Sequence, residues 1–358
     1  MPTYTRSLAT FEDVRAAFPV LDRFAYLNAG TNGPLARSTV EAMLAEELVD
    51  LTNGRGGEPY FSRALDMRGE VRAKLAAHLG SEPSQVSLTR STTDGCNIVL
   101  AGLRLGQDDE VVTTDVEHFG LIGPLHASGA KVVTAPEEKI LDAVTDRTRL
   151  IAVSHVSWVT GNSLDPAGIK AQTGLPVLVD GAQSAGVLPV KAADVDYYAV
   201  SCQKWLCGPD VTGALVVARP DELNVALPSY FAQTEHQPDG SYAAREGAER
   251  FDSGWIGTPS LAGLSAALDV HPEWRFERIA EMAAKFRAAL DGRFEVVTKP
   301  AQAGLVTFRP ASDPTELVAK LREEGVIVRE LPGRNLIRVS CGYWTSDDDL
   351  ERLLGGLS

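Results

Sequence analysis

Short apolar runs rich in β-branched residues recur along the first two thirds of the chain, with amphipathic stretches between them. This alternation is typical of a mostly parallel sheet covered by helices, and it predicts an α/β fold. The predicted strands lie at 85–88, 110–114, 131–134, 150–154, 176–180, 197–201 and 213–218. Helices are expected at 93–105 and 119–128, and a third begins at Asp165-Pro166, where Asp is the N-cap and Pro takes the first helical position.

The pattern changes after the polar, glycine-containing stretch 233–247. Helices are then predicted at 259–268, 276–290, 314–324 and 347–357, and strands at 294–298, 305–309, 326–329 and 336–340. Because strands and helices are intermixed over so short a stretch, a small α+β domain is expected here. We therefore predict a large α/β domain at 22–251 and a small domain at 252–358 that also includes the N-terminal segment 1–21.

The chain is acidic, with 34 Lys and Arg residues against 48 Asp and Glu residues and a net charge of −14. A chain of this charge repels a nucleic-acid backbone or an anionic membrane surface, so neither partner is expected. A small phosphate group can still bind to a few placed donors, such as the N–H groups at a helix start. No apolar stretch approaches the roughly 18 residues of a membrane-spanning helix.

The four cysteines are too few for a disulfide framework and form no C-x-x-C pair, which favours reduced thiols. Charged residues interrupt positions 1–18, so no secretory signal is predicted there. These observations favour a cytoplasmic protein, and no metal site is expected.

Two predicted strands end in residues with catalytic side chains. Asp180 ends the strand at 176–180, and ligands of open α/β sheets bind at the carboxyl ends of strands. An Asp at this position could also simply cap the next helix. Lys204 follows the strand at 197–201, beside Trp205 and Leu206. Apolar surroundings disfavour the charged form of a lysine, so its amine can act as a nucleophile or form an imine with a carbonyl.

Hydroxyl side chains mark the helix that follows the first strand. Ser91, Thr92 and Thr93 stand at its start, where free N–H groups and the helix dipole attract anions. An ordinary helix cap has the same appearance. His118 follows the predicted strand at 110–114 and lies at its carboxyl end.

These are the groups that pyridoxal 5'-phosphate (PLP) requires: a lysine for attachment, a carboxylate for the pyridine nitrogen, a phosphate cup and a flat side chain. The motifs, in chain order, are Thr92-Thr93, His118, Asp180-Gly-Ala-Gln183 and Ser201-x-x-Lys204. In this order they resemble the class V aminotransferase family of PLP enzymes, which includes cysteine desulfurases, cystine lyase and isopenicillin N epimerase. The resemblance extends from 26–30 to 338–340. It implies fold type I, with a mostly parallel seven-stranded sheet in the large domain and a small C-terminal α+β domain.

The resemblance also implies a role for each motif. Lys204 would hold the cofactor covalently and move protons, Asp180 would pair with the pyridine nitrogen, and His118 would stack on the ring. Gln183 would bind the phenolic oxygen, and Arg338 would grip the substrate carboxylate as a bidentate fork. The remaining cofactor-binding candidates are Ser91, Thr92, Thr93, Ser201, Gln203 and Thr258, and the remaining substrate-binding candidates are Asn28, Ala29 and Gly30. Thr258 would reach the phosphate bound by a partner subunit, which implies a homodimer with shared sites.

Three departures from the family pattern bear on the reaction. Gln203 stands where most members have a histidine, so this position cannot titrate. Trp158 replaces a polar residue of desulfurases; an aromatic side chain there is more similar to cystine lyase, although it could simply pack against the site. The stretch 329–335 is short and has no cysteine, whereas a desulfurase carries its persulfide on a cysteine in this region.

These departures favour a carbon–sulfur β-lyase that acts on a small amino acid, cysteine or a cysteine S-conjugate, and not a persulfide-forming desulfurase. An aminotransferase that uses a 2-oxo acid and an amino-acid epimerase remain alternatives, because the cofactor serves all three reactions. A protein that binds ligand without turnover is a further alternative, disfavoured by the presence of Lys204, Asp180 and Arg338.

Overall fold

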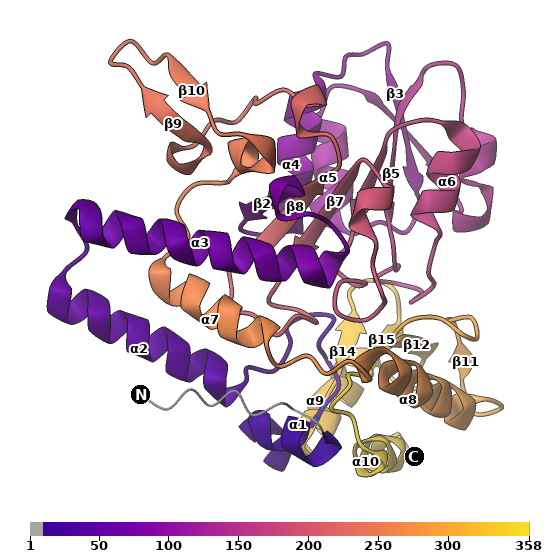
Figure 1. The fold of residues 1–358 in the computed structure, drawn as a ribbon. Coiled ribbons are helices and arrows are strands. Elements are labelled where there is room, and N and C mark those ends of the chain that lie inside the picture. The colour runs from indigo at the N-terminus through magenta and orange to yellow at the C-terminus, as the bar shows by residue number, and fades with distance from the viewer. Residues whose placement is uncertain (1–9, 358) are drawn as a thin grey trace.

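A seven-stranded sheet forms the centre of the larger unit in the computed structural model, which describes residues 10–357 (Figure 1). All strands are parallel except β8, which is antiparallel to both of its neighbours. In spatial order the strands are β2 (Val86–Thr89), β8 (Gly213–Val217), β7 (Tyr197–Ser201), β6 (Val177–Asp180), β5 (Thr148–Ser154), β3 (Glu110–Thr114) and β4 (Lys131–Ala135). The predicted fold class and all seven strands are confirmed.

Helices cover both faces of this sheet, because its strands are apolar on both sides. Successive strand residues alternate between two cores: Val177 and Val179 pack on one face, and Leu178 packs on the other. The first face is covered by α3 (Gly57–Leu79), α6 (Pro166–Thr173) and α7 (Thr258–Leu268), and the second by α4 (Thr92–Leu103) and α5 (Phe119–Ala127). The carboxyl ends of the strands are therefore held in place between two packed layers of helices.

The smaller unit is built on a four-stranded antiparallel sheet. Its order is β11 (Glu295–Val296), β12 (Leu305–Arg309), β15 (Leu336–Ser340) and β14 (Arg329–Leu331). Apolar side chains of α8 (Arg275–Leu290), α9 (Pro314–Glu323) and α10 (Asp347–Gly356) pack against it. The strand predicted at 326–329 is split, because β13 (Val326–Ile327) pairs with β1 (Ala25–Tyr26) and β14 pairs with β15.

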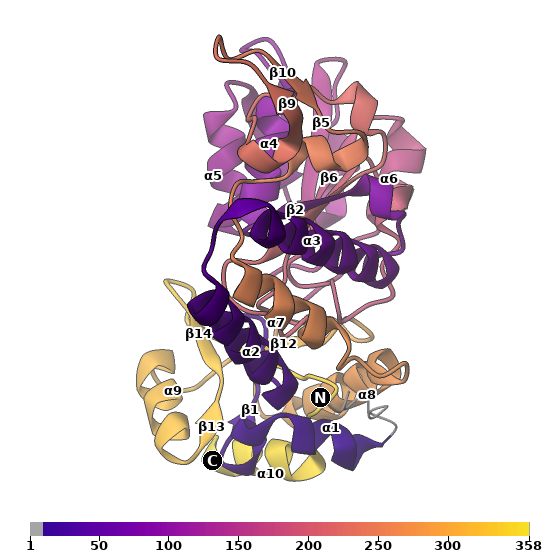
Figure 2. The ribbon, with the colours of Figure 1, turned by 60° about the vertical axis from the view of Figure 1, so that its left-hand side comes forward.

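The sequence pattern did not reveal the three α-helices that the structure describes before residue 80, α3 among them, or the two strands in the stretch before α7. The long helix α2 (Arg37–Asn53) lies beside α3 and α7, and α1 (Phe11–Ala17) lies near α10 (Figures 1 and 2). The strands β9 (Gln233–His236) and β10 (Tyr242–Ala244) form a hairpin that projects from the larger unit. No helix among residues 10–357 is both long and apolar enough to span a membrane.

The hydrophobic cores divide the chain differently from the boundaries expected at 22 and 252. Ile256 and Leu261 pack into the core under the seven-stranded sheet, whereas Ala25 and Leu27 pack into the core of the smaller unit. We therefore propose that the larger unit begins near residue 30 and ends with α7. Residues 1–9 of the predicted N-terminal segment lie outside the described part of the chain.

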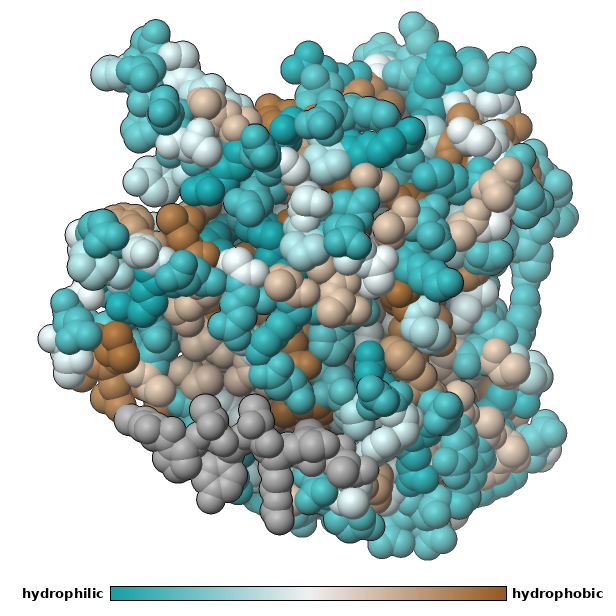
Figure 3. Space-filling model, viewed as in Figure 1, coloured by the Kyte–Doolittle hydropathy of each residue, from teal (hydrophilic) through white to brown (hydrophobic). Residues whose placement is uncertain are grey.

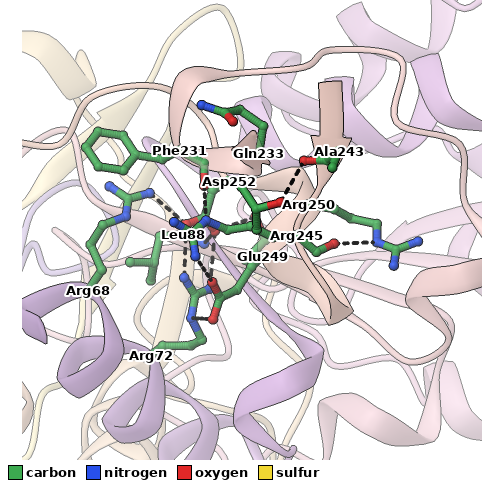
Figure 4. A network of polar contacts seen from close by, with 12 residues as sticks. Arg68, Arg72, Leu88, Phe231, Gln233, Ala243, Arg245, Glu249, Arg250 and Asp252 are labelled. Carbon is green, nitrogen blue, oxygen red and sulfur yellow. Dashed lines mark hydrogen bonds and ion pairs between the residues drawn. The ribbon is translucent and has the colours of Figure 1, made fainter. Parts of the chain in front are cut away.

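A buried ion network fastens the segment before α7 to the rest of the larger unit (Figure 4). The Asp252 carboxylate accepts hydrogen bonds from Arg68 Nη2 at 2.7 Å, Arg72 Nη2 at 2.9 Å and the Leu88 backbone N–H at 2.8 Å. Arg72 also pairs with Glu249 at 3.4 Å. Each charge is matched by an opposite charge nearby, which is the condition for a stable buried ion pair.

Candidate functional site

The predicted chemical groups lie at the carboxyl ends of neighbouring strands. Asp180 ends β6, Lys204 follows β7, and His118 lies between β3 and α5. Lys204 and His118 are each close enough to Asp180 and Arg338 for the charges to act on them. The structure therefore brings the candidate catalytic residues together with the candidate carboxylate-binding arginine.

Burial lowers the pKa of Lys204 to about 8. Asp180 acts in the opposite direction, and Arg338 and Arg329 add to the lowering. The lysine loop is fixed by the N-terminal segment, because Gly33 N–H donates to the Gln203 carbonyl at 2.8 Å. A Cβ atom at Gly33 would overlap the carbonyl group of Lys204, so only glycine allows this approach. A neutral, well-positioned amine is thus accessible near physiological pH.

Asp180 and Gln183 are buried in the turn that follows β6. One carboxylate oxygen of Asp180 accepts from the Ala182 N–H at 2.9 Å. The Gln183 amide donates to the Gly30 carbonyl at 2.8 Å and accepts from the Trp205 indole at 2.9 Å. Because a Gln amide nitrogen carries two hydrogens, one remains for a ligand.

The hydroxyls of the predicted phosphate cup meet at the start of α4. Ser91 caps the helix by accepting from the Asp94 N–H at 3.2 Å, and Ser201 Oγ lies 2.9 Å from both the Thr92 N–H nitrogen and Thr92 Oγ1. Thr93 lies beside the start of α5, since a Cβ atom at Gly120 would be 2.6 Å from its hydroxyl. The starts of α4 and α5 and the four hydroxyls of the cup therefore lie close together, an arrangement that suits a phosphate group.

Gln203 and His118 differ in how their polar atoms are satisfied. Gln203 Oε1 is buried and accepts no hydrogen bond from residues 10–357. His118 Nδ1 accepts from the Gly120 N–H at 3.0 Å, which requires the proton of the neutral ring to be on Nε2. Burial lowers the pKa of His118, with Lys204 and Arg338 acting in the same direction, so the neutral ring is favoured.

Two adjacent arginines give the site a net positive charge. Arg338 is 3% exposed and lies across from Arg329 in the β14–β15 pairing. Both guanidinium groups donate to Thr31 Oγ1, at 3.3 and 3.2 Å, and Arg338 Nε makes no hydrogen bond within residues 10–357. Neither arginine forms an ion pair with a carboxylate of the described chain. Burial lowers the pKa of Arg338 and Arg329 lowers it further, but a guanidinium remains charged at neutral pH. An anionic ligand would compensate these charges.

The N-terminal residues Asn28, Ala29 and Gly30 border the two arginines. Asn28 Oδ1 accepts from the Thr31 hydroxyl at 2.8 Å, and the Gly30 N–H donates to Ser340 Oγ at 3.0 Å. A Cβ atom at Gly30 would lie 3.0 Å from both Arg338 Nη2 and Gln183 Oε1, so the absence of a side chain leaves room beside the guanidinium. Ala29 is fully buried and packs into the surrounding core.

Sequence reasoning missed four contributors to the site: Thr31, Ser340, Arg329 and Glu117. The glycine turn could have indicated Arg329, because a hairpin centred on Gly333-Arg334 places residue 329 opposite residue 338. Glu117 is buried and accepts hydrogen bonds from the Ser154 N–H at 3.0 Å and from the Thr114 hydroxyl at 2.7 Å. Burial raises its pKa to about 7. Its position beside His118 ties the β3–α5 turn to β5.

Thr258 is the one predicted cofactor residue that the structure does not bring to the others. Its side chain is buried and donates to Asp50 Oδ2 at 2.9 Å, while Arg63 binds the other oxygen of the same carboxylate. Its predicted contact with a phosphate of the partner subunit would require the hydroxyl to leave Asp50, so this role stays a prediction. In the described part of the chain, no group of three or more His, Cys, Asp or Glu could hold a metal ion.

Comparison with known proteins places this geometry in a family. The family model for aminotransferase class-V matches residues 26–353. A probable cysteine desulfurase of Methanothermobacter thermautotrophicus is 29% identical, with 96% of each chain aligned. The isopenicillin N epimerase of Amycolatopsis lactamdurans is 30% identical, covering 92% of this chain and 94% of the relative.

Solved structures agree with the sequence comparison. The cystine C–S lyase C-DES, in complex with its reaction product cysteine persulfide, has a TM-score of 0.88 at 30% identity, covering 95% of this chain and 98% of that chain. A second structure of C-DES carries glycine covalently linked to its PLP cofactor. The family model spans nearly the whole chain, including the strand ends and the hairpin that form the site. The chain therefore belongs to the aminotransferase class-V family.

Proposed function

We propose that this PLP-dependent enzyme is a carbon–sulfur β-lyase that acts on cysteine or a cysteine S-conjugate. The observation that carries the proposal is the state of the cysteines. All four, Cys96, Cys202, Cys207 and Cys341, are buried, and burial raises the pKa of each thiol, for Cys202 and Cys341 to about 12. The thiolate is the nucleophilic form of cysteine, so these buried thiols are unsuited to accept a persulfide sulfur.

The hairpin between β14 and β15 supports the same conclusion. Only four residues, Pro-Gly-Arg-Asn at 332–335, connect the two strands, and the chain turns back at Gly333, whose φ is +71°. So short a connection has no room for a mobile arm, and none of its residues is a cysteine. A desulfurase mechanism, in which a thiolate attacks the substrate sulfur, lacks its nucleophile here.

The residues of the site fit PLP. We infer that the hydroxyls of Ser91, Thr92, Thr93 and Ser201 hold its phosphate, with the Gln203 amide as a further donor. Lys204 provides the attachment point, and the Asp180 carboxylate lies where a protonated ring nitrogen could bind. The free hydrogen on the Gln183 amide would bind the phenolic oxygen, and the neutral His118 ring would cover one face. When bound, PLP supplies the electron sink that stabilises negative charge at the substrate Cα atom.

The chain's own residues then direct the bond that breaks. Arg338 binds the substrate carboxylate, and the neighbouring Arg329 adds positive charge. Lys204 Nζ accepts the proton from Cα; that electron pair forms the Cα–Cβ double bond, and the pair of the breaking Cβ–S bond leaves on sulfur, which takes up a proton. Water hydrolyses the remaining enamine to pyruvate and ammonia. A thiol is released, or a persulfide if the substrate is a disulfide.

The test is product analysis with the PLP-loaded enzyme. L-Cystine and a panel of S-substituted cysteines should yield pyruvate, ammonia and a sulfur product in equal amounts. As a matched control, Cys341→Ala and Cys202→Ala should each retain pyruvate formation, because neither thiol takes part. No pyruvate from any of these substrates would overturn the proposal. Accumulation of the pyridoxamine form without acceptor would instead favour an aminotransferase, and D-amino acid without pyruvate an epimerase.

We also propose that the enzyme is a homodimer. An apolar stripe along α2, formed by Val40, Leu44, Leu48 and Leu51, is exposed to between 40 and 79% in the single chain. Residues at this spacing lie on one helix face, and apolar side chains appear at the left edge of Figure 3, in the area of α2. A monomer rarely leaves such a stripe uncovered. Leu48→Glu should lower the molecular mass in solution to that of one chain, as measured by light scattering; an unchanged mass would contradict this interface.

A further inference from the structure

The indole of Trp158 holds a hydrogen-bond donor that has no acceptor. Trp158 Nε1 is buried and makes no hydrogen bond to any of residues 10–357. Its ring packs partly on Leu331 and Leu336, the residues at the base of the β14–β15 hairpin. Buried indole N–H groups normally find a partner, because a donor that loses water without gaining an acceptor is destabilising. An acceptor from outside the chain would resolve this.

Trp158 lies between the candidate cofactor and substrate groups. Its ring meets the His118 ring edge-on, with centroids 5.1 Å apart and an angle of 87° between the ring planes. Its backbone carbonyl accepts from Arg338 Nη1 at 3.2 Å. The indole therefore packs against the residue proposed to cover the cofactor ring, and the backbone of Trp158 is held by the residue proposed to bind the substrate carboxylate.

The surroundings of the indole favour an anionic acceptor. The Arg334 guanidinium lies 5.9 Å from the centre of the Trp158 ring, at the exposed tip of the hairpin. Arg329, on the same hairpin, has no carboxylate partner in the described chain. A negatively charged acceptor at the indole N–H would be attracted by both guanidinium groups, and charge-assisted hydrogen bonds are the stronger kind.

We propose that Trp158 is a specificity-determining residue whose indole N–H binds the distal carboxylate of a dicarboxylic amino acid, such as the second carboxylate of cystine. This inference rests on the proposed carbon–sulfur lyase function for the identity of the substrate. It goes beyond that function in stating which substrates are preferred: those with a carboxylate at the end remote from the reacting carbon. A packing role alone predicts no such preference.

The test compares the wild type with Trp158→Phe, which keeps an aromatic ring but removes the N–H donor. For S-carboxymethyl-L-cysteine, which has a distal carboxylate, kcat/KM should fall about 10- to 100-fold in the variant. For S-ethyl-L-cysteine, which has none, it should change less than about threefold. Equal losses for the two substrates would reduce Trp158 to a packing residue and overturn the proposal.

A binding measurement separates this inference from the proposed reaction. The PLP-loaded enzyme is titrated with L-2-aminoadipate and with L-norleucine, which lack a sulfur leaving group, and binding is followed by the absorbance of the cofactor. Trp158→Phe should weaken the binding of aminoadipate about 10- to 100-fold and leave that of norleucine unchanged. If this pattern appears without pyruvate from any substrate, the lyase proposal fails and the role of Trp158 stands. If pyruvate forms but the pattern is absent, the role of Trp158 fails.

Discussion

Two pairs of arginines in this molecule differ in how their charge is balanced: Arg68 and Arg72 are both buried, whereas the buried Arg338 is paired with the half-buried Arg329. Arg68 and Arg72 share the carboxylate of Asp252, which is 1% exposed and also accepts from the Leu88 N–H (Figure 4). Arg338 and Arg329 share only the hydroxyl of Thr31. The charge of the first pair is compensated by carboxylates of the chain itself, although Arg68 Nη1 and Arg72 Nε make no hydrogen bond within residues 10–357. The second pair is held in place but left with its charge uncompensated.

The difference separates a structural use of arginine from a ligand-binding one. Burying a charge such as that of Arg338 without a counter-ion is unfavourable, and a fold retains it when a ligand supplies the opposite charge. Backbone strain also distinguishes the region around Lys204 from the Asp252 network. Cys207 and Val211, close to Lys204, have φ values of +54° and +61°, a region that residues other than glycine rarely adopt. The region around Lys204 thus holds unbalanced charge and strain that the Asp252 network does not.

Asp252→Asn should have the largest effect on stability, because it removes the carboxylate that balances the charges of Arg68 and Arg72. The substitution keeps the size of the side chain but leaves the buried Arg68 without a counter-ion and Arg72 with only the half-exposed Glu249, which should lower the free energy of unfolding by about 3–5 kcal/mol. Urea denaturation measures this. Burial raises the pKa of Asp252, but Arg72 and Arg68 outweigh it and the pKa is lowered. The wild-type protein should therefore keep this stabilisation above the unfolded pKa of about 4 and lose it as the pH falls through the folded value.

Glu249→Gln is the matched control for that prediction. Glu249 pairs with the same Arg72 at 3.4 Å, but its side chain is 37% exposed, so its loss should lower the free energy of unfolding by less than about 1 kcal/mol. If the two variants were destabilised equally, burial and charge balance would not explain the role of Asp252, and the contrast between the two arginine pairs would collapse.

Arg338→Met should have the opposite effect, with no loss of stability and a large loss of activity. Removing an uncompensated buried charge should leave the free energy of unfolding unchanged or raise it, whereas kcat/KM should fall about 10²- to 10³-fold through the loss of the substrate carboxylate contact. Denaturation and steady-state kinetics of the same preparation check both parts. A variant that is strongly destabilised would show that Arg338 is a structural residue, balanced by a partner in the fold.

The sequence was sufficient for the central sheet and for the order of the site motifs. Buried parallel strands are continuous apolar runs, so β3 and β7 were predicted to the residue. Lys204 and Asp180 could be placed because the carboxyl ends of such strands lie at one edge of the sheet. These predictions relied on the local pattern of apolar and polar residues, and they were correct where that pattern determines the place of a residue in the fold.

Features that depend on distant parts of the chain escaped prediction. The apolar stripe of α2 faces outward, so it does not mark a face that packs in the core of the same chain. Asp252 is separated by 180 residues from Arg72, and no local signal joins them. Thr31 and Arg329 meet only because the smaller unit folds back over the N-terminal segment. The balance of charge around each arginine pair could not be judged before these contacts were known.

Arg329→Met should have a smaller effect, on the titration of Lys204. Burial and the nearby arginines lower the pKa of Lys204 to about 8, so the neutral amine increases as the pH rises through this value. Removing Arg329 removes one positive charge, and the pKa should rise by roughly half a unit to one unit. The measurement is the pH dependence of PLP attachment to the cofactor-free enzyme. Arg334→Met, on the same hairpin, should not move the midpoint, because Arg334 is not among the charges that act on Lys204; an equal shift in both variants would contradict a specific effect of Arg329.

The smallest expected effect concerns the strain near Lys204. Val211 is β-branched, 61% exposed and held at a φ of +61°, so its side chain contributes little to the core while its backbone is unfavourable. Val211→Gly should raise the free energy of unfolding by about 0.5–1 kcal/mol, since relief of the left-handed conformation exceeds the added entropy of the unfolded chain. Val211→Ala keeps a Cβ atom in the same conformation and should gain less. A gain from glycine that leaves kcat unchanged would show that the strain is incidental, whereas a stabilised enzyme with reduced kcat would show that the strain, like the unbalanced charge of Arg338, is retained for the reaction.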